Sequence, residues 1–119
     1  MIAQYEAGNL LRQEISQLSG KVYPSRISLE VYALMNYFSD YTKHAVEEHN
    51  FNTAKKCFAL AERLFRQGDK IVRMLIENIF VFAFTSMLPV DREERSLVRS
   101  MIPVDLYSLY IKQVTQSGC

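Results

Sequence analysis

The sequence contains no tryptophan, only two cysteines, three prolines and four glycines, and its charges nearly cancel. With 14 basic and 13 acidic residues, the formal net charge is +1, so no overall field favours nucleic acid or an anionic membrane surface. Cys57 and Cys119 allow at most one disulfide, and we expect both to be free thiols in a reducing compartment. These scarcities argue against a disulfide-stapled secreted domain and against a polyanion-binding protein.

The chain also lacks a long uncharged hydrophobic run. Its most apolar segment, residues 71–88, is close to the length that crosses a bilayer, but it contains Arg73, Glu77 and Asn78. Residues 1–20 mix charged and apolar positions, unlike the apolar region of a secretory signal peptide. We therefore expect a cytoplasmic protein in which residues 71–88 form a buried helix.

Hydrophobic residues make up 49% of the 119 positions, with seven Phe and seven Tyr, so the chain is too apolar to be disordered. Its length fits one domain, residues 1–119. The few glycines and prolines separate segments of helical periodicity, which predicts an all-α fold. We expect a compact bundle of five to six helices around a central apolar helix at about 69–88. The expected helices cover 2–18, 28–48, 52–67, 69–88, 91–101 and 104–115.

Several residues are typical of helix ends. Asn52 is expected to cap the helix that ends at Gln67, and Gly68 is expected to end it in the left-handed conformation. Asp69 is expected to cap the central helix, and Asp91, with Glu94 three residues later, forms a capping-box-like start. The β-branched and aromatic run at 79–84 could instead be a strand, but no other segment alternates and could pair with it.

Residues 49–69 resemble the turn and second helix of a tetratricopeptide repeat. The small–aromatic–small pattern of that family is present as Ala54, Phe58 and Ala61. The resemblance covers a single hairpin, about residues 28–69. The same stretch, together with the apolar helix that follows, also resembles small uncharacterised bacterial helical proteins of the toxin-immunity type. Both resemblances imply protein binding rather than chemistry.

Candidate catalytic and metal-binding groups are sparse. Asp40, His44 and Glu48 are spaced by four residues, so they could share a helix face as carboxylate and imidazole ligands do. A di-iron bundle site needs Glu-x-x-His pairs on two helices, whereas the chain has only two histidines, so we expect no metal and no cofactor. Cys57 has no catalytic partner in the sequence, and no glycine-rich phosphate loop is present. We therefore expect a protein that is not an enzyme.

Two charged residues in the central helix need an explanation. Arg73 and Glu77 lie one turn apart, and if buried they are expected to pair with each other. A second hypothesis places them on a polar groove that Asn78 would extend.

An aromatic flank beside the core face of the helix at 28–48 is the main functional signal. Its rings and polar rim are typical of protein interfaces, although tyrosine is also common at the edge of a core. The flank consists of Tyr37, Tyr41, His44 and Glu48.

We therefore expect a non-catalytic helical protein that binds another protein, or a second copy of itself as a homodimer, through this flank or through the end of the helix at 69–88. An immunity protein, an adaptor and a small regulator all fit this description. The alternative is a bundle that holds a small apolar ligand or a metal between helices, near Phe80 and Phe84.

Overall fold

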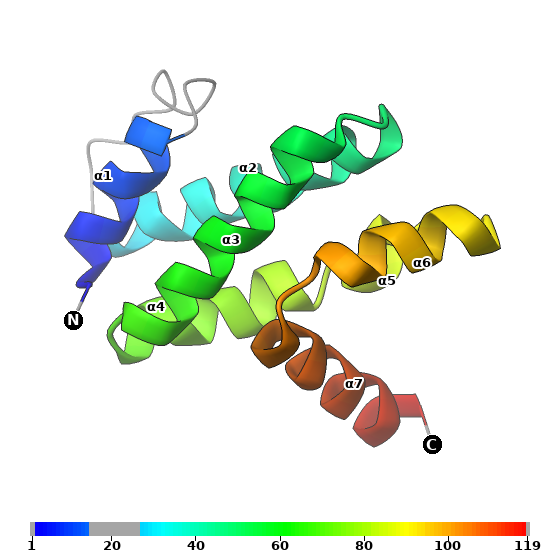
Figure 1. Cartoon of the computed structure of the whole chain (residues 1–119). Coiled ribbons are helices and arrows are strands. Elements are labelled where there is room, and N and C mark those ends of the chain that lie inside the picture. Colours follow the sequence, from blue (N-terminus) through cyan, green and yellow to red (C-terminus); the bar gives the residue numbers. More distant parts are fainter. Residues whose placement is uncertain (1, 15–26, 119) are drawn as a thin grey trace.

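The computed structural model describes residues 2–14 and 27–118, and the regular elements in these ranges are helices, which confirms the all-α fold (Figure 1). The predicted end of the first helix, at residue 18, lies outside the described residues. The elements are α1 (Gln4–Glu14), α2 (Ile27–Glu47), α3 (Phe51–Gln67), α4 (Lys70–Leu75), the π-helix η2 (Ile76–Val81), α5 (Phe84–Met87), α6 (Arg92–Met101) and α7 (Val104–Gly118).

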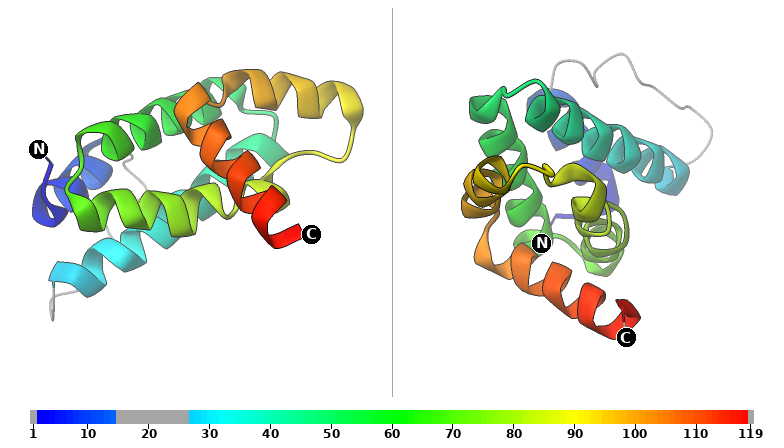
Figure 2. Two further views of the ribbon diagram at one scale, coloured as in Figure 1. Left: turned by 90° about the horizontal axis from the view of Figure 1, so that it is seen from below. Right: turned by 90° about the vertical axis from the view of Figure 1, so that its right-hand side faces the viewer.

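The core forms where an α2–α3 hairpin packs against the central helix, which consists of α4, η2 and α5 (Figures 1 and 2). One face of α2 packs into the core through six buried side chains at helical spacing. They are Val31, Leu34, Met35, Phe38, Thr42 and Ala45. On α3 the buried side chains are Ala54, Cys57, Phe58, Leu60, Ala61 and Leu64.

Four phenylalanine rings fill the centre of this core. Phe80 stacks on Phe38 with ring centroids 4.8 Å apart, and it meets Phe58 and Phe84 edge-on at 6.1 and 5.6 Å. All four side chains are fully buried. Because aromatic pairs in these geometries attract beyond their burial, the rings join α2, α3 and the central helix into one unit.

The turn between α2 and α3 differs from the prediction. The His49 amide donates to the Val46 carbonyl at 3.1 Å and the Asn50 amide to the Ala45 carbonyl at 2.8 Å, which is the pattern of a Schellman motif. His49 therefore takes the left-handed conformation, with φ of 60°. The side chain of Asn50 caps α3 by accepting from the Thr53 amide at 3.4 Å, so the prediction of Asn52 as the cap was wrong.

Gly68 also differs from the prediction, because its backbone is extended, with φ of −71° and ψ of 157°. A glycine is needed there for space rather than for a left-handed turn. A Cβ atom would lie 2.3 Å from the Leu64 carbonyl oxygen and 2.5 Å from Cγ1 of Val72. The extended backbone continues into Asp69, whose amide donates to the Ile2 carbonyl at 2.7 Å and whose side chain caps α4, as predicted.

The π-helix shifts the register of the central helix by one residue. Val72, Leu75 and Ile76 face the core with ordinary α-helical spacing, which would next place Ile79, Ala83 and Ser86 inward. The wider π turn adds one residue, so the buried positions become 80, 81, 84 and 87 instead. The same shift turns Phe82 directly away from the core.

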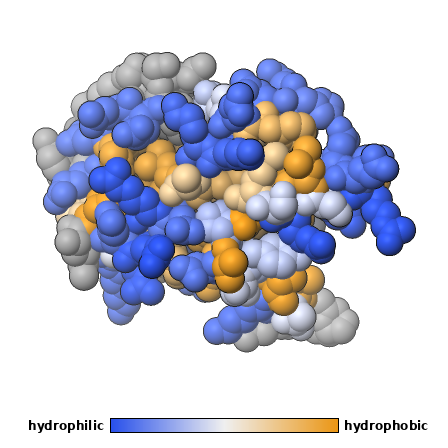
Figure 3. Space-filling model, in the orientation of Figure 1, coloured by the Kyte–Doolittle hydropathy of each residue, from blue (hydrophilic) through white to orange (hydrophobic). Residues whose placement is uncertain are grey.

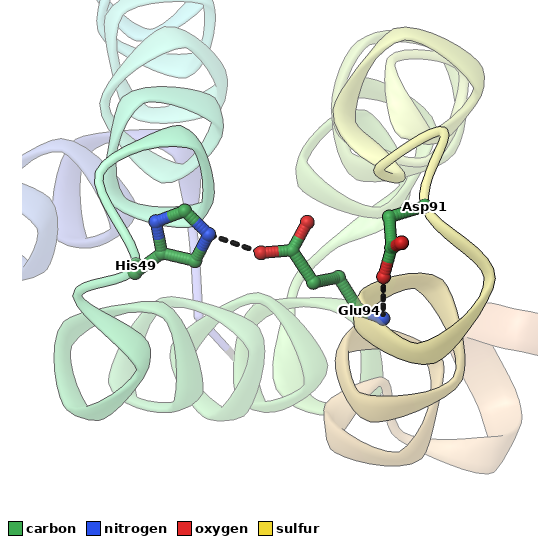
Figure 4. A network of polar contacts seen from close by, with 3 residues as sticks. All are labelled: His49, Asp91 and Glu94. Carbon is green, nitrogen blue, oxygen red and sulfur yellow. Dashed lines mark hydrogen bonds and ion pairs between the residues drawn. The ribbon is translucent and has the colours of Figure 1, made fainter.

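The C-terminal arm, α6 and α7, attaches through few buried side chains: Val98, Ile102 and Leu106. Asp91 caps α6 by accepting from the Glu94 amide at 3.0 Å, as the capping-box pattern predicts. Nε2 of His49 contacts the carboxylate of Glu94, which ties the α2–α3 turn to the first turn of α6 (Figure 4). Within the described ranges, no helix combines the length and the apolar character needed to cross a membrane.

Candidate partner-binding groove

A groove of about 650 Å³ runs between α2, the η2–α5 segment and α7. Its apolar lining includes Tyr32, Ile79, Phe82, Tyr110 and Val114. Its polar lining includes Asn36, Asp40, Asn78 and Gln113. Helical elements form the sides of this surface, which we call the Phe82 groove.

Phe82 is the most exposed aromatic side chain among the described residues, with 72% of its surface accessible. Its neighbours Phe80 and Phe84 are fully buried, so the helix presents one of three closely spaced phenylalanines to solvent. This exposure follows from the π turn, and π turns inside α-helices occur frequently at functional sites. Phe82 is therefore the largest apolar side chain that the described part of the fold leaves open to a partner.

Polar contacts fix both sides of the groove. Nε2 of Gln113, on α7, donates to the Glu77 carbonyl within the π segment at 2.9 Å. On α2, Nδ2 of Asn36 donates to the Tyr32 carbonyl one turn earlier at 3.1 Å. Among the described residues that line the groove, Asp40 carries the only formal charge. The groove thus combines an exposed aromatic anchor with one carboxylate and several side-chain amides.

The predicted flank of Tyr37, Tyr41, His44 and Glu48 does not line this groove. Tyr37 and Tyr41 each follow a groove residue by one position, which places them about 100° further round α2. Both are half-buried against the core, whereas the His44 side chain is 70% exposed and pairs with Glu47 at 3.4 Å. The flank is a second surface of α2, and its role as a partner site stays a prediction.

The three central-helix residues predicted to share a polar groove do not share one: Asn78 lines the Phe82 groove, whereas Arg73 lines a separate pocket beside Arg66. Arg73 lies elsewhere, with its guanidinium 5.1 Å from the ring centre of Phe65. This cation–π contact gives Arg73 a structural partner on α3 in place of the pair with Glu77 that burial would have required. Phe80 and Phe84, where a ligand cavity was expected in the alternative hypothesis, pack against Phe38 and Phe58 in the core.

Cys57 lies at the bottom of a small pocket of about 90 Å³ beside Tyr41. Burial raises the pKa of the Cys57 thiol, against the opposing effects of a Thr42 hydrogen bond and the charge of Lys56. Burial, followed by the charge of Cys57, also raises the pKa of Tyr41. A thiol that stays protonated is a weak nucleophile. In the described part of the chain, no three His, Cys, Asp or Glu side chains are grouped as metal ligands.

Fold and site together define a small all-α protein with a solvent-facing aromatic groove. The chain belongs to the DUF7674 family, a domain of unknown function, and the match extends over residues 8–116. No curated protein and no solved structure matches the chain.

Proposed function

We propose that this protein binds another protein through the Phe82 groove and carries out no reaction of its own. The observation that carries the proposal is the 72% exposure of Phe82 beside a groove of about 650 Å³. Aromatic side chains are enriched at the centres of protein interfaces, where they supply large contact areas at a small cost in side-chain entropy. A partner that covers Phe82 would remove from water the apolar surface that the π turn leaves outside the core.

The lining residues indicate what the partner presents. Ile79, Phe82 and Val114 can accept an apolar side chain, while the carboxylate of Asp40 complements a basic group. Asn36 and Asn78 offer amides at the rim. We therefore expect a helical segment with an apolar residue that packs on Phe82 and with an Arg or Lys near Asp40.

The proposal of a non-catalytic role draws support from the ionisable groups of the groove. Apart from Asp40, its described titratable lining residues are the two phenols of Tyr32 and Tyr110. A general acid–base mechanism at neutral pH is usually served by a histidine or by a carboxyl group with a shifted pKa. Protein binding by a cytoplasmic immunity protein, adaptor or small regulator is consistent with this composition.

A small-molecule ligand is the second candidate occupant of the groove. The volume of the groove falls within the roughly 300–1,000 Å³ typical of ligand pockets. The groove is lined by polar as well as apolar groups, so such a ligand would be amphipathic. This candidate moves the predicted ligand site from Phe80 and Phe84 to the outer side of the same helix.

The first experiment places a photo-crosslinking amino acid at position 82 in the cell that makes the protein. Position 90 is the matched control, because Val90 is 92% exposed and does not line the groove. We expect a discrete protein adduct from position 82 and none from position 90. Adducts of equal yield at both positions, or none at position 82, would contradict the proposal.

The second experiment measures the affinity of the crosslinked partner for purified variants. Phe82→Ser should weaken binding by about tenfold or more, which corresponds to about 1.4 kcal/mol or more, since it removes the anchor. Val90→Ser should leave binding unchanged. Tyr41→Ala tests the predicted flank in the same assay, and a larger loss there than at Phe82 would move the site to that side of α2.

A further inference from the structure

The polar atoms of the Phe82 groove restrict the chemistry of its occupant more than its apolar side chains do. Apolar patches lie among hydrophilic side chains in several places on the face seen in Figure 3, so exposed apolar surface alone does not select a partner. The groove adds a negative charge without a positive one. None of its described lining residues is a lysine, an arginine or a histidine, whereas Asp40 carries a carboxylate.

Asp40 has no partner in the described part of the chain. Other carboxylates serve the fold: Asp91 caps α6, and Glu94 contacts His49. Asp40 is exposed, and no hydrogen bond or ion pair among the described residues includes it, although Lys43 lies only three residues further along α2. The charge of Asp40 is therefore left for a cation that enters the groove.

The polar groups beside this carboxylate are left as acceptors. Nδ2 of Asn36 donates to the Tyr32 carbonyl at 3.1 Å, so the oxygen of the same amide remains to accept a bond. Asn36 precedes Asp40 by four residues, which places the amide and the carboxylate one turn apart on one face of α2. Across the groove, the Ser86 hydroxyl donates to the Ala83 carbonyl at 3.0 Å, which leaves its oxygen as an acceptor. This arrangement calls for an occupant with several N–H donors.

Exposed aromatic rings complete the lining. Phe82 is 72% exposed and Tyr32 is 53% exposed, and Tyr110 lines the groove from α7. The face of an aromatic ring attracts a cation, and the flat, weakly hydrated guanidinium of arginine stacks on such a face. The ammonium of lysine is compact and strongly hydrated, so it gains less from the same rings.

From these observations we infer that the Phe82 groove recognises an arginine side chain of the partner protein. The guanidinium pairs with Asp40 and lies against the exposed rings, and its planar set of five donors also serves the oxygen of Asn36. The inference rests on the proposed protein binding, and it selects arginine from the two basic residues considered there. It also excludes an acidic partner segment, which the Asp40 carboxylate would repel.

Nuclear magnetic resonance titration of the ¹⁵N-labelled full chain tests this chemistry with a blocked amino acid, N-acetyl-L-arginine N-methylamide. We expect saturable shifts confined to amides around the groove, with an affinity of about millimolar, which is what one side chain can supply. The matched citrulline derivative has the same shape without the charge, and the lysine derivative has the charge without the planar fork. Both should bind about threefold or more weakly.

Variants of the chain assign the preference to the groove. Asp40→Asn should weaken the arginine probe by about threefold or more and remove its advantage over citrulline. Glu93→Gln is the matched control, because it changes the net charge equally at an exposed position of α6 outside the groove, and it should have no effect. Phe82→Leu keeps an apolar side chain without a ring and should also weaken the arginine probe.

Equal affinities for the arginine and citrulline probes, or equal effects of Asp40→Asn and Glu93→Gln, would overturn the inference. Free arginine that binds more tightly than the blocked probe would point to a small-molecule ligand and overturn the protein source. Crosslinking from position 82 is read separately. A discrete protein adduct with no arginine preference would remove this inference and leave the proposed function, whereas a selective probe without an adduct would contradict the proposed function and, with it, the protein source of the guanidinium.

Discussion

The body of the molecule, from α1 to α5, and its C-terminal arm, α6 and α7, differ in the number of apolar side chains that they bury. Of the described residues, all but three of the buried apolar side chains belong to the body. The arm contributes Val98, Ile102 and Leu106 to the interior but leaves Leu97, Val104 and Ile111 in contact with water. The body therefore supplies most of the core, although it also exposes Phe82, while most apolar side chains of the arm are partly or largely exposed.

The boundary between the two regions explains why the arm is available for contacts. The body closes on itself around Phe80, whereas α7 has one fully buried side chain, Leu106. Its other attachments are half-buried side chains and polar contacts near the surface, which include Tyr107, Leu109, Tyr110, Asp105 and Gln113. Elements with few buried contacts open at lower free energies than the core does. The Phe82 groove includes residues of α7, so one of its sides belongs to this lightly buried arm.

The largest effect should come from Phe80→Ala, which removes the ring at the centre of the body. Replacement of a buried phenylalanine by alanine costs about 3–5 kcal/mol, a large share of the 5–15 kcal/mol that stabilises a typical domain. Phe82→Ala is the matched control two residues away, and its exposed ring predicts a change within about 0.5 kcal/mol. Urea unfolding followed by circular dichroism measures both. Similar losses for the two variants would show that the register shift at η2 is wrong.

A smaller effect is expected from Leu106→Ala, which weakens the attachment of the arm. We expect a loss of about 2–3 kcal/mol, the low end for buried leucine, because the thin interface can relax around the gap. The loss should appear first as faster hydrogen exchange of the α7 amides, with α2 and α3 still protected. Val104→Ala, on the exposed side of the same helix, is the control. Uniform loss of protection throughout the chain would show that arm and body unfold together.

Replacement of two glycines in the body by alanine should change the stability of the protein in opposite directions. Gly68→Ala forces a Cβ against the Leu64 carbonyl oxygen and should destabilise the fold by about 1–3 kcal/mol. Gly8→Ala places its Cβ 3.6 Å from Cδ1 of Leu34, an ordinary contact, and should stabilise α1 by about 0.5–1 kcal/mol. Thermal unfolding of both variants measures the two changes in stability. A stable Gly68→Ala protein would mean that the α3–α4 turn can shift enough to relieve the contacts with Leu64 and Val72.

In α2 and α3 the buried side chains recur at helical spacing and polar residues mark the outer sides, so the sequence indicates which faces pack inward. In the central helix, by contrast, the run at 79–84 is apolar throughout, so periodicity cannot show which residue faces inward. The π turn that selects Phe80 and exposes Phe82 therefore left no readable pattern. A conformational choice of this kind depends on how the phenylalanine rings pack in three dimensions.

The turn residues show the same limit on a smaller scale. Asn50 and Asn52 are both suitable N-cap residues. The Schellman motif at His49 ends α2 so that Asn50 is the residue that caps α3. The pattern predicts a left-handed turn at Gly68, but the backbone there is extended, and the Leu64 carbonyl oxygen and the Val72 side chain leave no room for a Cβ atom. For the candidate site, the sequence indicated Asn78 and the end of the central helix. It gave no sign that α7 lines the same groove.

The smallest predicted effect tests how well the body is sealed, through the pH dependence of its stability. Because burial raises the pKa of Cys57, the unfolded chain releases the thiol proton first as the pH rises above about 8.5. The unfolded state then binds fewer protons than the native state, so stability is constant below that pH and falls above it. Urea unfolding between about pH 7.5 and pH 10 should show this decline in the wild type, and a shallower one in Cys57→Ala. Tyr41, whose pKa is also raised, adds a further decline only above its ordinary value of about 10. Equal slopes in the two proteins would mean that water reaches the Cys57 thiol, and that the body is more open around α2 and α3 than its packing indicates.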